Sequence, residues 1–170
     1  MSKDEKRRNT WTLAFGVALL PPIWAVLAPH IGVTTGAVAL ICAGVFAANG
    51  NKYEDALRIS LGFLCGDLWA VAALFLMDKL PVSPDLETFL VLFVMGGLAV
   101  LISTALERVI YLPAWLSGWA IGLTIMAPVG WGGLDSLPVQ IGAAMLAGVL
   151  YVGVGVDLFQ KKLLKLWKSK

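Results

Sequence analysis

The sequence predicts an all-α membrane protein, with a single domain over residues 1–170 built as a bundle of six transmembrane helices. Three observations support this fold class. Hydrophobic residues make up 59% of the chain and charged residues 14%, whereas soluble domains carry about 25% charged residues. Six apolar runs are long enough to cross a bilayer as helices. The basic residues gather in alternate connecting segments, as the positive-inside rule describes for membrane proteins.

The six apolar runs cover residues 12–29, 33–48, 59–77, 88–106, 112–128 and 139–158, and the second and fifth are short. The first follows a basic start and so imitates a signal peptide, but its length of about eighteen residues favours a retained span. Pro21 and Pro22 lie in its middle, where we expect the helix to bend or break. After the last run, apolar residues alternate with lysines, so residues 159–170 are expected to form a basic amphipathic cytoplasmic tail on an anionic leaflet.

The basic residues also predict the orientation. If the N-terminus is cytoplasmic, six spans return the C-terminus to the same side, and twelve of the thirteen Lys and Arg residues are then cytoplasmic. The exception is Lys79. This asymmetry supports both the even number of spans and the cytoplasmic termini. The cytoplasmic residues are Lys3, Lys6, Arg7, Arg8, Lys52, Arg58, Arg108, Lys161, Lys162, Lys165, Lys168 and Lys170.

A weak internal similarity links the two halves of the chain. If three spans were duplicated, the second set would insert upside down because three is odd, which predicts a 3+3 inverted repeat. Such repeats bind their ligands near the bilayer midplane, commonly beside short or interrupted helices, and here the second and fifth runs are short. The matching pairs, at an offset of 80 residues and then after a two-residue insertion, are Ala47 and Ala127, Gly50 and Gly130, Asp55 and Asp135, Leu57 and Leu137, Gly62 and Gly142, and Gly66 and Gly148.

Asp67 is the strongest functional candidate. It lies eight residues into the run 59–77, roughly 12 Å inside a hydrocarbon core about 30 Å thick. An acid at that depth costs about 2.5–3.5 kcal/mol on insertion scales and normally faces a bundle interior or a wet cavity. Gly62, Gly66 and Ala70 form a small-residue seam beside it, so we expect a closely packed neighbour. Two interpretations stay open: a neutral acid hydrogen-bonded to a backbone carbonyl, or a group that meets a proton or a polar solute.

Six further residues are candidates for lining a pathway. Trp24, Trp69 and Trp119 lie deep in their runs, where an indole either fills the core or lines a narrow path. Phe46 and Asn49 end the second run, and this stretch is either an ordinary cytoplasmic loop or a gate at which Asn49 hydrogen-bonds the solute. Thr124, in the fifth run, adds a hydroxyl group.

Several classes of function lack the residues that they need. His30 is the only histidine, and Cys42 and Cys65 lie in apolar runs, so we expect no metal site, no cofactor and no disulfide. The sequence contains no phosphate-binding glycine loop, dinucleotide fingerprint or nucleophile elbow, so we do not expect an enzyme. A net charge of +2 gives no reason to expect a nucleic-acid partner.

Some short motifs recur in a recognisable order. They are Ile23-Trp24-Ala25, Phe46-Ala47, Leu61-Gly62, Trp69-Ala70, Leu112-Pro113, the stretch from Gly118 through Ala127, and the glycine-rich sixth run. Over roughly residues 12–160 this order resembles the bacterial inner-membrane proteins grouped as domain-of-unknown-function family 1097. The resemblance implies a compact multi-span protein of the bacterial inner membrane and implies no activity. It also leads us to expect a small or hydroxylic residue at Asp67, so no role for Asp67 follows from it.

The sequence favours a small channel or facilitator for a small neutral or weakly polar solute, such as a urea-like amide. The observations behind this hypothesis are the midplane Asp67, the interrupted first span, the two short spans and the scarcity of charge inside the membrane. The small-residue seams suggest that copies of the chain pack together as a homo-oligomer in the bilayer. The alternatives are a proton-coupled transporter in which Asp67 changes protonation state, and a non-transporting scaffold or partner subunit.

Overall fold

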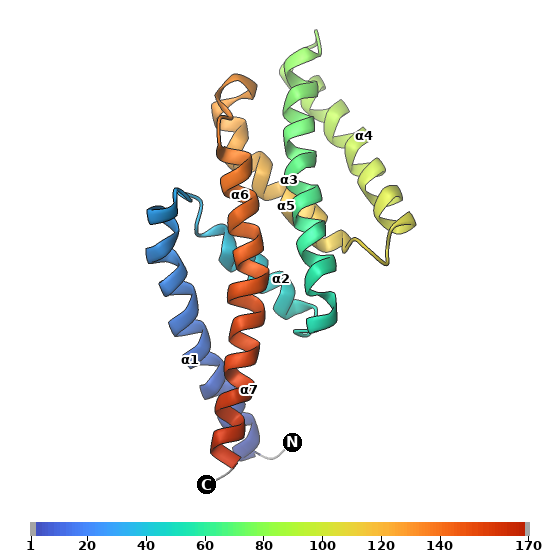
Figure 1. Ribbon diagram of the computed structural model, residues 1–170. Coiled ribbons are helices and arrows are strands. Elements are labelled where there is room, and N and C mark those ends of the chain that lie inside the picture. The colour runs from blue at the N-terminus through green and yellow to red at the C-terminus, as the bar shows by residue number, and fades with distance from the viewer. Residues whose placement is uncertain (1–2, 169–170) are drawn as a thin grey trace.

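The computed structural model describes residues 3–168, which form helices joined by short turns and contain no strand (Figure 1). Residues 1–2 and 169–170 lie outside the described part, and with them Lys170 of the predicted tail. The main elements are α1 (Lys3–Leu27), α2 (Val38–Ala48), α3 (Ala56–Lys79), α4 (Pro84–Ala105), α5 (Leu112–Met126), α6 (Leu137–Leu146), the π-helical segment η5 (Ala147–Gly153) and α7 (Val154–Lys168). Short 3-10 turns occur at η1 (Ala28–Ile31), η2 (Tyr53–Asp55), η3 (Ala127–Val129) and η4 (Trp131–Gly133).

Five helical segments of residues 3–168 are long and apolar enough to cross a membrane, and α2 is a sixth, shorter apolar helix. With 11 residues, α2 is about 17 Å long, less than the roughly 30 Å of a hydrocarbon core. The predicted all-α fold is therefore confirmed, and these apolar helices fit a membrane bundle, but α2 is shorter than the predicted second span. Its predicted first part, residues 33–37, forms turns after Gly32, which has a left-handed φ of 79°.

The first helix is not interrupted at its prolines, because α1 continues through Pro21 and Pro22 to Leu27. Each proline removes one amide donor, so only two carbonyl groups one turn earlier lose their helical partner. Membrane helices tolerate such a loss when neighbouring elements or local adjustments satisfy these groups. The helix ends instead at η1, which contains Pro29 and is followed by Gly32.

The last span and the basic segment after it form one helical run, because α6, η5 and α7 follow one another without a break. In Figure 1, α7 continues the line of α6 and lies beside α1. The rings of Phe15 and Phe159 stack with their centroids 6.0 Å apart. The side chain of Gln160 donates a hydrogen bond to the Asn9 carbonyl at 3.0 Å. The described part of the predicted tail is therefore a helical extension of the last span that packs on α1.

The helices are arranged similarly in the two halves of the chain. Figure 1 shows α3 and the continuous run of α6, η5 and α7 as long central helices, α1 and α4 at the two flanks, and α2 and α5 running obliquely between them. Each half thus contains, in order, a flanking helix, a short oblique helix and a long central helix.

Glycines allow the oblique helix α5 to approach α3 very closely. A Cβ atom on Gly118 would lie 2.5 Å from the Phe63 carbonyl oxygen, and one on Gly62 would lie 2.7 Å from the Tyr111 carbonyl oxygen. A Cβ atom on Gly66 would overlap the backbone of Trp115 and Trp119. The expected small-residue seam is therefore a contact within one chain, and Asp67 is the residue next to it.

Candidate functional site

Asp67 lies where α3, α5 and α6 meet, and its side chain is buried, with 4% of the residue exposed. Two glycines flank the carboxyl group. A Cβ atom on Gly122 of α5 would lie 3.5 Å from Asp67 Oδ1, and one on Gly142 of α6 would lie 3.7 Å from Oδ2. The predicted close neighbour is thus present, and the positions on α5 and α6 next to the two carboxyl oxygens carry no side chain.

The carboxyl oxygen Oδ1 of Asp67 has no hydrogen-bond partner among residues 3–168. The ion pairs of this part of the chain, between Arg58 and Asp55, Lys79 and Asp78, and Lys161 and Asp157, do not include Asp67. A buried polar atom without a partner costs about 1–3 kcal/mol, and more when it is charged. The site therefore contains one group that a proton donor or a polar molecule would satisfy.

Ser60 is a second buried polar residue on α3, and sequence reasoning missed it. It is 3% exposed, and its hydroxyl group has no partner within the described residues. Seven residues separate it from Asp67, so the two lie on the same side of the helix about 10 Å apart along its axis. That heptad spacing between two polar residues in an apolar run is the signal by which the sequence could have revealed it.

The tryptophans of the candidate set lie elsewhere. The Trp69 indole donates a hydrogen bond to the Met95 carbonyl at 3.1 Å, and its ring meets Trp115 edge-on with centroids 5.3 Å apart. Trp119 is buried against Gly96 of α4, and its indole nitrogen has no partner within residues 3–168. Since residues 67 and 69 are about 200° apart around a helix, Trp69 points away from the Asp67 side. These side chains fill the space between α3, α4 and α5.

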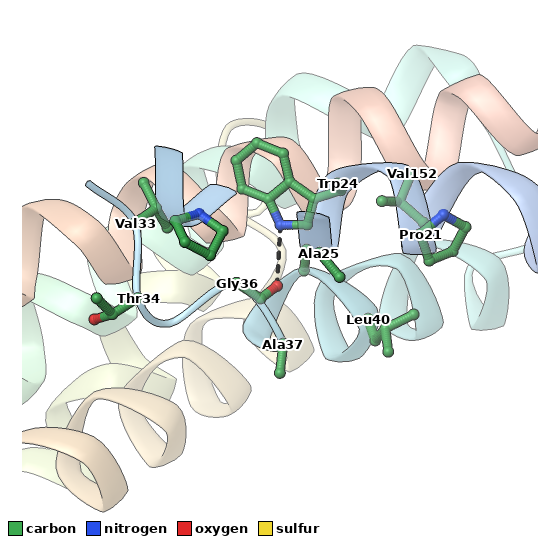
Figure 2. A pocket seen from close by; sticks show the side chains of 11 residues that line it. Pro21, Trp24, Ala25, Val33, Thr34, Gly36, Ala37, Leu40 and Val152 are labelled. Atoms are coloured by element: carbon green, nitrogen blue, oxygen red, sulfur yellow. Dashed lines mark hydrogen bonds between the residues drawn. The ribbon is translucent and has the colours of Figure 1, made fainter. Parts of the chain in front are cut away.

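Trp24 lines a cavity of about 200 Å³ between α1 and α2 (Figure 2). Its indole donates a hydrogen bond to the Gly36 carbonyl at 3.0 Å, which fastens α1 to the turn before α2. Pro21, Thr34 and Leu40 are among the other residues around this cavity, and Asp67 is not. Trp24 and Asp67 are thus in different places.

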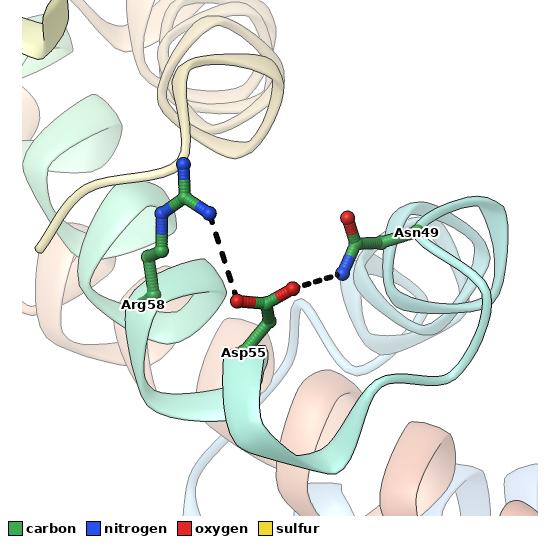
Figure 3. A network of polar contacts seen from close by, with 3 residues as sticks. All are labelled: Asn49, Asp55 and Arg58. Carbon is green, nitrogen blue, oxygen red and sulfur yellow. Dashed lines mark hydrogen bonds and ion pairs between the residues drawn. The ribbon is translucent and has the colours of Figure 1, made fainter. Parts of the chain in front are cut away.

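Phe46 and Asn49, at the end of α2, have separate surroundings. Phe46 is fully buried, and a Cβ atom on Gly153 of η5 would lie 2.8 Å from its ring. Asn49 donates a hydrogen bond to Asp55 Oδ2 at 2.8 Å, and Asp55 Oδ1 lies 3.6 Å from Nη1 of Arg58 (Figure 3). This polar network fixes the turn between α2 and α3. Phe46 is a packing residue in this conformation.

Thr124 lies on the outside of α5, facing a groove of about 370 Å³ between α2 and α5. Its hydroxyl group donates to the Ala120 carbonyl at 2.7 Å, as is usual for threonine in a helix. The seven candidate residues therefore do not form one site. Asp67, with Ser60 below it on α3, is the part where an unpartnered carboxyl oxygen and an unpartnered hydroxyl group lie on the same side of one helix.

Two contacts join the halves at opposite ends of the bundle. Before α2, the amide and the hydroxyl group of Thr34 both donate to Oε1 of Gln140 in the first turn of α6, at 2.9 and 2.7 Å. Before α5, the Tyr111 amide donates to the Arg58 carbonyl at 3.4 Å, and the Arg58 guanidinium lies 5.5 Å from the Tyr111 ring centroid. Since α3 and α6 start at opposite ends in Figure 1, these contacts close opposite ends of the molecule.

The fold and the site define a membrane protein of several helical spans whose central helices enclose the Asp67 carboxyl group. The chain belongs to the family described as "Protein of unknown function (DUF1097)", whose family model matches residues 14–161. This confirms the resemblance carried by the sequence motifs. No curated protein and no solved structure matches the chain.

Proposed function

We propose that this protein is a facilitator that moves a small neutral or weakly polar solute, such as a urea-like amide, across the membrane past Asp67. The observation that carries the proposal is the buried Asp67 carboxyl group with its unpartnered Oδ1 between Gly122 and Gly142. An ionisable residue inside a membrane bundle marks a pathway or relay by default. The amide N–H groups of such a solute would donate to this oxygen.

The arrangement of the two halves supports transport. We interpret them as a 3+3 inverted repeat, in which α1, α2 and α3 correspond to α4, α5 and the run from α6 to α7. The matched glycines Gly66 and Gly148 both lie where a long helix meets an oblique one, since a Cβ atom on Gly148 would lie 2.7 Å from Ala39 Cα of α2. Inverted repeats bind substrates between the halves near the midplane, and Asp67 follows Gly66 at the first crossing.

Because Asp67 is buried, a carrier that opens alternately to each side of the membrane fits the structure better than a permanently open pore does. The contact between Thr34 and Gln140 would release for opening at one end, and the contact between Arg58 and Tyr111 for opening at the other. Both are hydrogen bonds or ring contacts at exposed or half-buried sites, so breaking them costs little. With the positive-inside asymmetry, the Arg58 end would be cytoplasmic.

The second candidate function is proton-coupled transport. Asp67 has no ion-pair partner among the described residues, so binding a proton is the simplest way for its carboxyl group to lose its charge. A carboxyl group that gained and released a proton on opposite sides would couple solute movement to a pH gradient. The same residue thus serves both hypotheses, and only the gradient distinguishes them.

Location and assembly belong to the proposal as well. We place the protein in a bacterial inner membrane with both termini cytoplasmic, where twelve basic residues would face the cytoplasm. Helix α4 is the element on which copies would pack into a homo-oligomer, because it lies at the flank and exposes Phe89, Phe93 and Leu101. The molar mass of the detergent-solubilised protein, measured by light scattering, tests this assembly.

Liposome flux measurements test the function. The wild-type protein, reconstituted with and without a pH gradient, should carry urea faster than empty vesicles do, and gradient-independent flux would exclude proton coupling. Gly142→Ala should slow the flux, because its methyl group would lie 3.7 Å from Asp67 Oδ2 and meet only the flexible end of Leu64 at 3.3 Å. Gly97→Ala on α4 is the matched control, since nothing lies within 4 Å of its added methyl group.

The outcomes separate the hypotheses. If Asp67→Ala folds normally and leaves the urea flux of the wild type unchanged, Asp67 is not on the pathway. If neither the wild type nor the variant carries urea or a related small amide, a scaffold or partner subunit becomes the better interpretation.

A further inference from the structure

A cleft of about 800 Å³ lies where the N-terminal end of α1 meets the C-terminal end of α7. It is lined by Asp4, Arg7, Arg8, Trp11 and Trp167. The four residues from α1 have the spacing of one helix face, and Trp167 comes from the other end of the chain. The cleft therefore exists only because α7 extends the last span and packs along α1.

The packing of α1 on α7 holds the two walls together. Gly16 accepts close contact from α7, since a Cβ atom there would lie 3.2 Å from Val156 and 3.4 Å from Phe159. The stacked rings of Phe15 and Phe159 and the hydrogen bond from Gln160 to Asn9 lie between this contact and the cleft. Both walls are thus continuous with membrane helices, which places the cleft at the end of the bundle.

The cleft combines two guanidinium groups with two exposed indoles. Trp11 is 64% exposed and Trp167 is 53% exposed, and Trp11 directly precedes the first apolar run. Amphipathic indole rings settle at the headgroup level of a membrane. Arginine forks bind phosphate oxygens in a bidentate manner, and the single acid of the lining, Asp4, leaves the lining with a net positive charge. Among the neighbours in sequence Glu5 is acidic, but Lys3, Lys6, Lys162 and Lys165 outnumber it and add to this positive charge.

We propose that this cleft binds the headgroup of an anionic phospholipid of the cytoplasmic leaflet. Arg7 and Arg8 would hold the lipid phosphate, and the rings of Trp11 and Trp167 would lie against the glycerol and upper acyl region. The exposed indoles favour a lipid over a soluble anion, because a soluble anion offers them no apolar surface. The proposal uses the cytoplasmic orientation of the proposed function but does not need transport, so the two fail separately.

The test measures lipid binding to the full-length protein in neutral detergent micelles by native mass spectrometry. Phosphatidylglycerol should bind with higher affinity than phosphatidylcholine of the same acyl chains. The double substitution Arg7→Gln with Arg8→Gln should weaken phosphatidylglycerol binding by roughly tenfold or more, given about fivefold per basic residue at an anionic surface. Arg7→Lys with Arg8→Lys should bind phosphatidylglycerol more weakly than the wild type but more tightly than the glutamine variant, since lysine keeps the charge but lacks the planar guanidinium group.

The matched control is Lys52→Gln with Arg108→Gln, which removes the same charge from the predicted cytoplasmic side outside the cleft. It should leave the affinity within about twofold of the wild type. An equal loss in this control, or equal binding of the two lipids, would overturn the proposal. Competition by millimolar inorganic phosphate that abolishes lipid binding would also overturn it, because the cleft would then be a site for a free anion.

Discussion

The two helix crossings of this protein share a geometry and differ in chemistry. At the first, Gly66 of α3 meets the backbone of α5 and is followed by Asp67. At the second, Gly148 of η5 meets the backbone of α2 and is followed by Val149, which is fully buried. Close backbone approach therefore requires only the glycine, and the residue after it is free to differ. The close approach at the second crossing is thus made without an acid, so the geometry of the crossing does not require Asp67.

The largest expected effect comes from removing the close approach itself. Gly66→Leu would place a side chain inside the backbone of Trp115 and Trp119. Because backbone cannot move aside as a side chain can, we expect no correctly folded protein. The measurement is the yield of a monodisperse peak in size-exclusion chromatography. The control Gly97→Leu, at a position where nothing lies within 4 Å of an added Cβ atom, should leave this peak in place.

The next largest effect is expected from placing an acid after the glycine of the second crossing, as Asp67 follows Gly66 at the first. Val149→Asp should lower the free energy of unfolding by about 2.5–3.5 kcal/mol, the usual cost of an acid deep in a membrane helix. Thermal unfolding in detergent measures this effect. If Val149→Asp were as stable as the wild type, the second crossing would already accommodate a polar group, and the two crossings would be equivalent.

The reverse exchange should have the opposite sign. Asp67→Val removes an unpartnered buried oxygen and should raise the free energy of unfolding by about 1–3 kcal/mol, while abolishing solute flux. A variant that is more stable and inactive is the expected signature of a functional residue. Should Asp67→Val be destabilising instead, the carboxyl group would have a structural role.

The smallest effect concerns the contacts that join the halves. Thr34→Val removes one of the two hydrogen bonds to Gln140 and should cost about 1 kcal/mol. Thr34→Val loosens only one end of the molecule. In a Ser60→Cys background, the reactivity of the cysteine toward a membrane-impermeant thiol reagent should therefore change when the reagent is added on one side of the membrane and not when it is added on the other. Tyr111→Ala, at the other end, should affect reactivity from the opposite side. Equal changes from both sides for either variant would argue against alternate opening.

Much of the fold could be predicted from the sequence because lipid imposes strong rules. Long apolar runs predict helices, and five long helical segments together with the shorter α2 lie at the six predicted runs. The glycine seam predicted a close neighbour for Asp67, and Gly122 is that neighbour. Local rules failed where tertiary contacts decide: α1 continues through Pro21 and Pro22, and the residues before Val38 form turns.

The candidate site was harder to predict. The position of a residue within an apolar run indicates its depth in the membrane but does not indicate which neighbouring helix its side chain faces. Trp24 and Asp67 both lie deep in their apolar runs but are in different places, and Trp69 points to the opposite side of α3 from Asp67. Ser60 escaped notice because a serine in a membrane helix normally bonds its own backbone. Only the structure reveals that its hydroxyl group has no such partner within residues 3–168.

The π-helical segment η5 has a consequence for the whole second half. An extra residue in a helical turn rotates everything after it relative to everything before it, without ending the helix. Gly142 can therefore face Asp67, while Val156 and Phe159, further along the same helical run, face α1. One continuous helical run thus packs on both α3 and α1. Deleting a single residue from Ala147–Gly153 would restore regular α-helical geometry and rotate one of these two faces away from its packing partner.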